Sequence, residues 1–176
     1  KINGSIATIG REGSITLADR ATGQIRWQTG SFGKLSTKPA FSEESVVFGT
    51  SDKVLFVISA KDGSIVSRQS AEMTPTSVTF SKDAGFTAGD ERGNVSLFGS
   101  SNTKTVWRFK SGAAVTSVTA TDEGILVSSL DNFVYFISDY NGDVIWKRRL
   151  SGRVIDGGLI VGGYLVVLIY GENSAY

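Results

Sequence analysis

The sequence contains no histidine and no cysteine among its 176 residues. Without histidine, this stretch cannot form a Ser-His-Asp triad, a histidine metal site or an imidazole general base. Without cysteine, it can form no disulfide, no thiolate nucleophile and no iron–sulfur centre. The two absences exclude many common catalytic and metal-binding sites, and we predict no cofactor and no metal for these residues.

Proline and net charge are also scarce. Only 2 prolines accompany 21 glycines, which favours tight turns between short strands over a flexible linker. Eighteen basic and 17 acidic residues give a net charge of +1, unlike a dedicated nucleic-acid binder. The longest uncharged run, residues 157–171, is shorter than the ~18 apolar residues of a membrane helix. Because Gly162-Gly163 lies near its centre, we predict a hairpin there and no transmembrane segment.

A repeat of about 40 residues runs through the chain. The turn glycines Gly23, Gly63 and Gly142 share one repeat position, which Thr103 occupies in the third copy. Four residues later, the same register contains all three tryptophans of the chain and, in the second copy, a serine: Trp27, Ser67, Trp107 and Trp146. A second series lies ten residues before the turn position: Gly13, Lys53, Gly93 and Asn132. We therefore predict repeats near residues 5–33, 34–72, 73–112 and 113–152, with a partial repeat at 153–176.

Each repeat has the pattern of four short strands. The third repeat predicts strands at residues 75–80, 86–90, 94–99 and 104–109, separated by turns rich in Gly, Asn, Asp and Ser. Four antiparallel strands in ~40 residues, repeated, are typical of a β-propeller blade. Neighbouring blades must pack face to face, and we expect Trp27, Trp107 and Trp146 to be buried between them. A β-sandwich is the alternative, although its strands need not repeat side chains at a fixed period.

The residues 19–27, Asp-Arg-Ala-Thr-Gly-Gln-Ile-Arg-Trp, resemble the D-x-x-T-G-x-x-x-W repeat of pyrroloquinoline-quinone-type β-propellers. Residues 138–146 are a looser copy, and residues 46–63 are similar to the family's second and third strands. The resemblance implies an all-β propeller of four-stranded antiparallel blades. It covers nearly the whole chain.

The resemblance leaves two functions open. One is a non-catalytic propeller that binds other proteins, similar to the barrel-assembly lipoprotein and implying a role in envelope or outer-membrane protein assembly. The alternative is a fragment of a quinone-dependent dehydrogenase whose catalytic residues lie outside this stretch. The family's catalytic cysteine pair and histidine match no residue here, which favours the first. The resemblance also implies a periplasmic or extracellular location.

The chain is expected to hold about four and a fraction blades of a seven- or eight-bladed propeller. It begins at a predicted second strand, Ser5–Ile9, and residues 173–176 align with the start of a third strand at 132–135. Because a strand left without a neighbour exposes a pairing edge, we expect either a longer chain or a second chain to supply the missing blades.

The candidate partner-binding site is a rim of loops. In an antiparallel four-stranded blade, the loops after the second and the fourth strand emerge at the same end. Charges of both signs gather in the first set of loops, and rigid blades commonly present such loops to partners. The candidate rim residues are Arg11, Glu12, Asp52, Lys53, Asp90, Glu91, Arg92 and Asp131. Ordinary turn chemistry accounts for the same residues equally well.

Two further clusters have simpler interpretations. Asp139, Asn141 and Asp143 resemble the start of a calcium loop, but Val144 and Leu150 stand where such a loop needs Gly and Glu, so we predict a turn. Lys147, Arg148 and Arg149 form the densest basic run. Because they follow Trp146 within a predicted strand, we expect a solvated outer strand.

Overall fold

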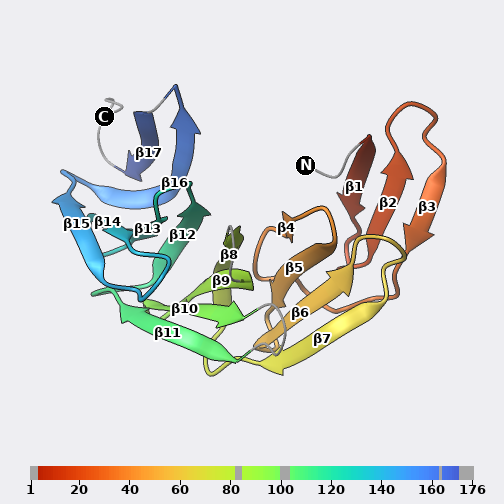
Figure 1. The fold of residues 1–176 in the computed structure, drawn as a ribbon, viewed down its shortest axis with the longest axis horizontal. Helices are drawn as coiled ribbons and strands as arrows, with labels where there is room; N and C mark the ends of the chain where they lie inside the picture. Colours follow the sequence, from red (N-terminus) through yellow and green to blue (C-terminus); the bar gives the residue numbers. More distant parts are fainter. Residues whose placement is uncertain (1–3, 82–84, 100–103, 163, 171–176) are drawn as a thin grey trace. The chain divides into compact units, whose positions relative to one another are not determined.

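Short antiparallel strands joined by tight turns make up the described structure. The computed structural model describes residues 4–81, 85–99, 104–162 and 164–170. These residues contain β-strands and no α-helix (Figure 1), so none of them forms a helix long and apolar enough to cross a membrane. The all-β fold class predicted from the repeat is confirmed. The aligned residues 173–176 lie outside the described ranges.

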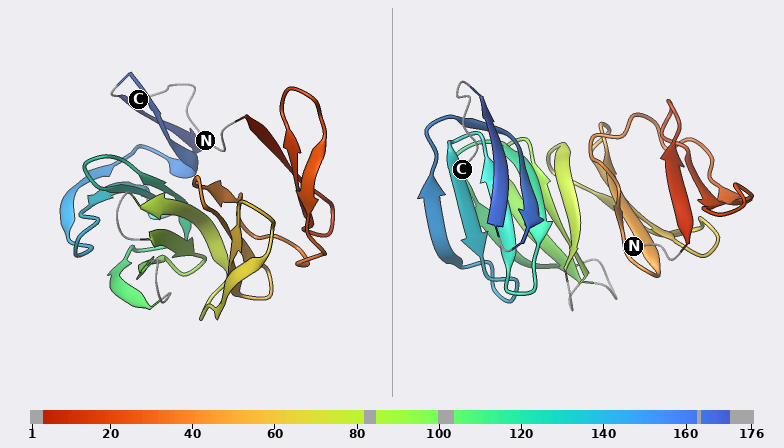
Figure 2. Two further views of the ribbon diagram at one scale, coloured as in Figure 1. Left: turned by 45° about the vertical axis from the view of Figure 1, so that its right-hand side comes forward. Right: turned by 90° about the horizontal axis from the view of Figure 1, so that it is seen from above.

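The strands form consecutive sheets, each built from neighbours in the sequence (Figures 1 and 2). Every pairing is antiparallel because short turns return the chain beside the strand it has just left. The first sheet has three strands: β1 (Ser5–Ile9), β2 (Ile15–Asp19) and β3 (Ile25–Gln28). The second has four: β4 (Ala40–Phe41), β5 (Ser45–Thr50), β6 (Val54–Ser59) and β7 (Ile65–Ser70).

The remaining strands continue this pattern. The third sheet comprises β8 (Pro75–Ser81), β9 (Gly85–Asp90), β10 (Asn94–Gly99) and β11 (Thr105–Lys110), within one residue of the predicted strand ends. The fourth comprises β12 (Val115–Ala120), β13 (Ile125–Ser129), β14 (Phe133–Ile137) and β15 (Val144–Arg149). A hairpin of β16 (Arg153–Val161) and β17 (Tyr164–Tyr170) follows.

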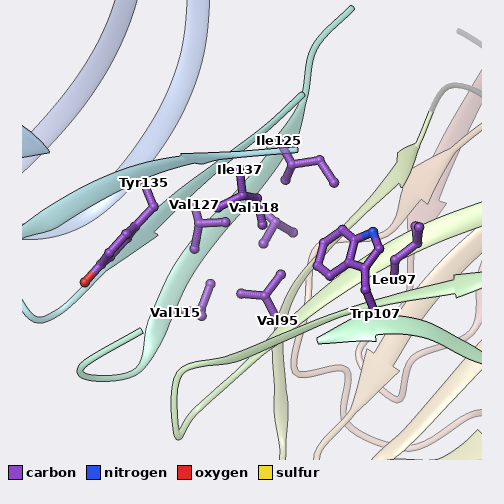
Figure 3. Packing of buried hydrophobic residues seen from close by; sticks show 9 residues of the cluster. All are labelled: Val95, Leu97, Trp107, Val115, Val118, Ile125, Val127, Tyr135 and Ile137. Carbon is purple, nitrogen blue, oxygen red and sulfur yellow. The ribbon is translucent and has the colours of Figure 1, made fainter. Parts of the chain in front are cut away.

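The chain divides into two compact units, Lys1–Pro75 and Thr76–Tyr176. In each unit, apolar side chains from adjacent sheets form the core. In the second unit, Leu97 and Trp107 pack against Val127 and Ile137 of the next sheet (Figure 3). In the first unit, Leu17 and Trp27 pack in the same way with Phe48 and Phe56. Within each unit, adjacent sheets therefore bury each other's faces, as blades must.

Strand burial follows position within a sheet. All five residues of β13 are buried, because Ile125 and Val127 face the third sheet while Leu126 packs with Val154 and Val167 of the hairpin. In contrast, all six residues of β15 at the sheet edge are exposed. In this sheet the inner strands β13 and β14 accordingly contain only apolar residues, serines and a tyrosine, whereas the outer strand β15 contains Lys147, Arg148 and Arg149.

Two tryptophans connect successive sheets in an identical way. The indole N–H of Trp27 donates to the carbonyl of Ala60 at 2.9 Å, and that of Trp107 donates to the carbonyl of Asp139 at 2.8 Å. Both side chains are buried, with 8% and 7% exposed. Each acceptor lies three residues before a turn glycine of the next sheet. We call this contact, an indole on a glycine turn of the next sheet, the indole dock.

The dock explains why glycine recurs at the turn position. Gly63 and Gly142 have φ of +75° and +77°, where other residues are strained. A Cβ on Gly63 would come within 2.8 Å of the Trp27 ring, and one on Gly142 within 2.7 Å of the Trp107 ring. Both the backbone conformation and the close approach of the indole therefore require glycine.

The expectation that Trp146 is buried was wrong. Its side chain is 43% exposed, and its ring contacts Phe136 at a centroid distance of 5.4 Å. In the two formed docks, the glycine follows the tryptophan by 36 and 35 residues. Among the described glycines, none lies against the Trp146 ring as Gly63 and Gly142 lie against the other two, so the repeat position alone does not bury this side chain.

We expect Trp107→Ala to lower the free energy of unfolding by about 3–5 kcal/mol, because it empties a packed core position and removes the hydrogen bond to Asp139. The matched control Trp146→Ala removes an exposed ring and should cost much less. Urea unfolding followed by far-UV circular dichroism measures both. Equal losses for the two variants would contradict the indole dock.

Candidate interaction surfaces

In the four-stranded sheets, the loops after the second and fourth strands are bonded to each other, and in the first sheet the loops after β1 and β3 are bonded in the same way. In the first unit, the amide of Gly33 donates to the carbonyl of Glu12 at 3.1 Å, and that of Ala71 to the carbonyl of Lys53 at 2.7 Å. In the second unit, Ser111 donates to Gly93 at 2.9 Å and Leu150 to Asn132 at 2.8 Å. Both sets of loops therefore lie at one end of each sheet. We call this end the rim.

A left-handed backbone conformation recurs at the rim. Gly13, Lys53, Gly93 and Asn132, which share one repeat position, all have positive φ, at +74°, +60°, +89° and +69°. At the two glycines, an added Cβ would lie 2.1 and 2.2 Å from the carbonyl oxygens of Gly33 and Ala113. Asparagine tolerates this conformation, but lysine does not adopt it readily. Lys53 therefore holds a strained position that the neighbouring hydrogen bonds maintain.

Two acidic rim residues hold the loops in place. Asp131 accepts hydrogen bonds from the Gly112 amide at 2.7 Å and the Tyr135 hydroxyl at 2.6 Å. Burial, followed by this carboxylate, raises the pKa of Tyr135 to about 12. Asp90 accepts from the amides of Arg92 at 2.8 Å and Asn94 at 2.9 Å. These carboxylates stabilise turns, which is the alternative that sequence analysis gave for the rim residues.

The other candidate rim residues extend into solvent. In the first unit these are Arg11, Glu12, Asp52 and Lys53, and in the second unit Glu91 and Arg92. Each unit thus presents exposed charges of both signs on loops that backbone hydrogen bonds fix to the sheets. Such an arrangement is suited to electrostatic recognition of a protein surface. The role of these residues as a binding site stays a prediction.

The opposite end of the first, second and fourth sheets carries the glycine turns. At the first of these, Asp19 accepts from the Ala21 and Thr22 amides at 2.9 and 3.0 Å and pairs with the Arg26 guanidinium at 2.8 Å. The Arg26 bond, with help from the two amides, lowers the pKa of Asp19 from 3.8 to about 2. The motif residues at 19–27 therefore build a turn.

The stretch Asp139–Asp143 is also a turn, joining β14 to β15. Asn141 donates through its side-chain amide to the Asp143 carboxylate at 2.6 Å. The carbonyl of Asp139 accepts the hydrogen bond from the Trp107 indole N–H. Within the described residues, no group of three His, Cys, Asp or Glu is placed to hold a metal ion.

A groove of about 660 Å³ lies between β15 and the β16–β17 hairpin. Val134, Leu165, Val167 and Ile169 supply its apolar part, and the run from Trp146 to Ser151 supplies a basic side. Sequence analysis placed the basic run on a solvated strand and missed the groove. A signal was present, because Trp146 is an aromatic residue at a docking position next to three cations.

One protein-family model matches the sequence. A family model described as outer membrane protein assembly factor BamB, built on PQQ-type repeats, matches residues 3–96, which is more than half of the chain. No match to this sequence was found among curated proteins.

Solved structures share the fold. BamB from Moraxella catarrhalis superposes with a TM-score of 0.81 at 17% identity, covering 97% of this chain and 53% of that one. The Cps50 (Swd1) β-propeller domain of Myceliophteria thermophila has a TM-score of 0.79 at 13% identity, covering 94% and 59%. Saccharomyces cerevisiae Sqt1 has a TM-score of 0.75 at 16% identity, covering 94% and 53%. The chain thus spans little more than half the length of these structures.

We expect Lys53→Gly to raise the free energy of unfolding by about 1 kcal/mol, because glycine adopts positive φ without strain. Lys53→Ala is the matched control: it removes the same side chain but keeps the strain, so it should bring no gain. Thermal unfolding monitored by circular dichroism compares them. If both variants gain equally, the lysine side chain and not the backbone is the cause.

We expect Arg26→Gln to raise the pKa of Asp19 from about 2 towards its ordinary value of 3.8, because the bond to Arg26 is the largest cause of the lowering. The lowered pKa means that ionised Asp19 favours the folded state above pH 3.8, and that this contribution is lost as the pH falls from 3.8 to about 2. Carboxyl ¹³C NMR titration measures the pKa of Asp19 in both proteins. Asp62, whose pKa is lowered chiefly by the Ser64 hydroxyl, is the internal control and should not move.

Proposed function

Because the chain belongs to the family described as outer membrane protein assembly factor BamB, we propose that it is a non-catalytic β-propeller scaffold that binds other proteins during outer-membrane protein assembly. The observation that carries this proposal is the family match over residues 3–96, which extends through the first two sheets into the third. The likeness to a solved BamB supports the fold on which the proposal depends.

The rim supplies the structural support for binding. Its loops are bonded to each other through backbone groups, which hold the loop backbones against the sheets. Charged side chains on a fixed backbone lose little conformational freedom of the chain when a partner binds. We therefore propose the exposed charges Arg11, Glu12, Asp52, Lys53, Glu91 and Arg92 as the partner-binding residues, while Asp90 and Asp131 maintain the loops.

A quinone-dependent dehydrogenase has less support. The cysteine pair and the catalytic histidine implied for enzymatic relatives have no counterpart in a sequence with neither residue. The location we propose is extracytoplasmic, at the outer membrane or in the periplasm, and it is supported by the description of the family alone.

The rim is tested by charge reversal. We expect Arg11→Glu with Asp52→Lys in the first unit, and Arg92→Glu in the second, to weaken capture of outer-membrane assembly proteins from a detergent-solubilised envelope extract by about tenfold. Melting temperatures should stay nearly unchanged because these side chains are exposed. Pull-down with quantitative mass spectrometry, at low and high salt, gives the measurement.

Lys61→Glu and Glu123→Lys serve as matched controls, since both side chains are exposed in turns at the opposite end of their sheets. They should capture partners as the parent chain does. Equal capture by rim and control variants would place the binding surface elsewhere. A rise in melting temperature with pyrroloquinoline quinone and calcium, together with dye-linked alcohol oxidation, would overturn the scaffold proposal in favour of the dehydrogenase.

A further inference from the structure

The turn under the Trp107 indole contains a chemically reactive pair, Asn141-Gly142. An asparagine followed by glycine deamidates readily, because no side chain on the glycine hinders its amide nitrogen from reaching the asparagine side-chain carbonyl carbon. The attack closes a succinimide ring and expels ammonia. The contacts around this pair therefore decide whether it reacts.

The side chain of Asn141 is prepared for this attack. The Asp143 amide donates to Asn141 Oδ1 at 3.1 Å, and Asn141 Nδ2 donates to the Asp143 carboxylate at 2.6 Å. A donor at Oδ1 draws electron density from the carbonyl carbon and stabilises the negative charge that the attack places on the oxygen. Asn141 is also exposed, so water reaches the side chain.

The attacking nitrogen, in contrast, is restrained by the dock. The Gly142 amide donates its N–H to the carbonyl of Ser138 at 2.9 Å, whereas the attack requires this nitrogen to lose its proton. Gly142 is buried, and a Cβ there would lie 2.7 Å from the Trp107 ring. Ring closure must rotate the peptide between residues 141 and 142, and the packed indole opposes that rotation.

The other docked turn lacks one part of this chemistry. Asp62-Gly63 lies under Trp27, but a carboxylate takes the place of the asparagine amide. The hydroxyl of Ser64, more than any other group, lowers the pKa of Asp62, which keeps this side chain ionised. Because an ionised carboxylate is a poor target for a nucleophile, Asn141 is the reactive residue of the two docked turns.

We propose that Asn141 is a modification site controlled by the indole dock: it is protected while Trp107 is docked and deamidates when the indole leaves the turn. In the open turn, the Gly142 nitrogen loses its proton to water or hydroxide and bonds to Asn141 Cγ. The Cγ–Nδ2 bond breaks, and the side-chain nitrogen takes up a proton from water and leaves as ammonia. Water then opens the succinimide at either carbonyl, giving aspartate or isoaspartate. This proposal does not depend on the partner-binding function proposed above.

Either product weakens the dock. Aspartate at position 141 places a second carboxylate where Nδ2 now donates to Asp143 at 2.6 Å, so that two like charges meet. Isoaspartate adds a methylene to the main chain between the Asp139 carbonyl, which accepts the indole N–H, and Gly142, on which the ring lies. Deamidation is therefore a one-way change that loosens the contact between the third and fourth sheets.

Peptide mapping by mass spectrometry, during incubation of the folded chain in mildly alkaline buffer, measures deamidation at Asn141. We expect Trp107→Ala to deamidate there at least about tenfold faster than wild type, because the dock no longer limits opening of the turn. Phe86→Ala is the matched control, since it empties a buried aromatic position on the other face of the third sheet. It should deamidate at the wild-type rate. The sequence's other Asn-Gly pair, Asn3-Gly4, belongs to the first unit and should react at one rate in all three proteins.

Trp107→Phe keeps the test decisive if the alanine variant unfolds. It retains an aromatic ring in the core and loses the N–H donor to Asp139, so it should deamidate faster than wild type by a smaller factor. Equal acceleration by Trp107→Ala and Phe86→Ala overturns the proposal, because deamidation would then follow unfolding of the whole unit. Wild-type rates in both Trp107 variants overturn it as well.

Substitutions at the site test the effect of the modification. Asn141→Asp reproduces the aspartate product, and we expect it to make hydrogen exchange of the Trp107 indole N–H about tenfold faster. Asn141→Thr is the matched control, because Thr22, at the same position of the first sheet, accepts the Gln24 amide at 3.3 Å without a charge. NMR of the indole N–H measures the exchange. Equal exchange in the two variants would overturn the inference that deamidation loosens the sheets.

Discussion

The contact on which the rest of this structure depends is the indole of one sheet lying on the glycine turn of the next. A single sheet of short strands buries one face poorly and exposes the other. The indole supplies about 150–250 Å² of apolar surface, worth about 4–6 kcal/mol if fully removed from water. Its N–H also satisfies a carbonyl at a turn, so the contact fixes both the distance and the register of two sheets.

That contact needs a tryptophan in one repeat and a glycine in the next, and the sequence has either both residues or neither. Trp27 has Gly63 and Trp107 has Gly142. At one place the sequence has neither member: Ser67 stands at the tryptophan position and Thr103 at the glycine position of the following repeat. The division into two compact units falls between these two positions. A glycine is thus retained where an indole must approach a turn closely, and there is no such steric requirement where the indole is absent.

Much of the fold could be predicted from the sequence, because a fixed period is visible wherever a packing contact repeats. The strands of the third sheet were predicted to within a residue, since β-branched and aromatic runs alternate there with turn residues. The prediction that Trp146 is buried was wrong, because the period identifies a docking residue without showing whether a turn covers it. The strain at Lys53 could have been predicted, as the residue stands in register with Gly13 and Gly93.

The candidate site was less accessible to sequence analysis. In the sequence, Asp90 and Asp131 are charged loop residues just as Arg11 and Arg92 are. In the structure, however, the two carboxylates accept hydrogen bonds from backbone amides and a tyrosine hydroxyl. Hydrogen bonds to a loop backbone leave no periodic signature. The groove was missed for a related reason, since its apolar residues come from β14 and β17, which are separate in the sequence.

The two ends of the sheets are under different constraints, and this difference bears on function. At the glycine-turn end, an indole approaches within contact of the backbone, so the residue type is restricted by packing. At the rim, the loops are held by backbone hydrogen bonds and by a few side chains such as Asp90 and Asp131, and no indole packs against Arg11, Glu12 or Asp52 to restrict the residue type. Side chains that the fold does not need can change without loss of stability. A scaffold of this kind can therefore acquire partner specificity at the rim while its sheets continue to pack through the indole dock.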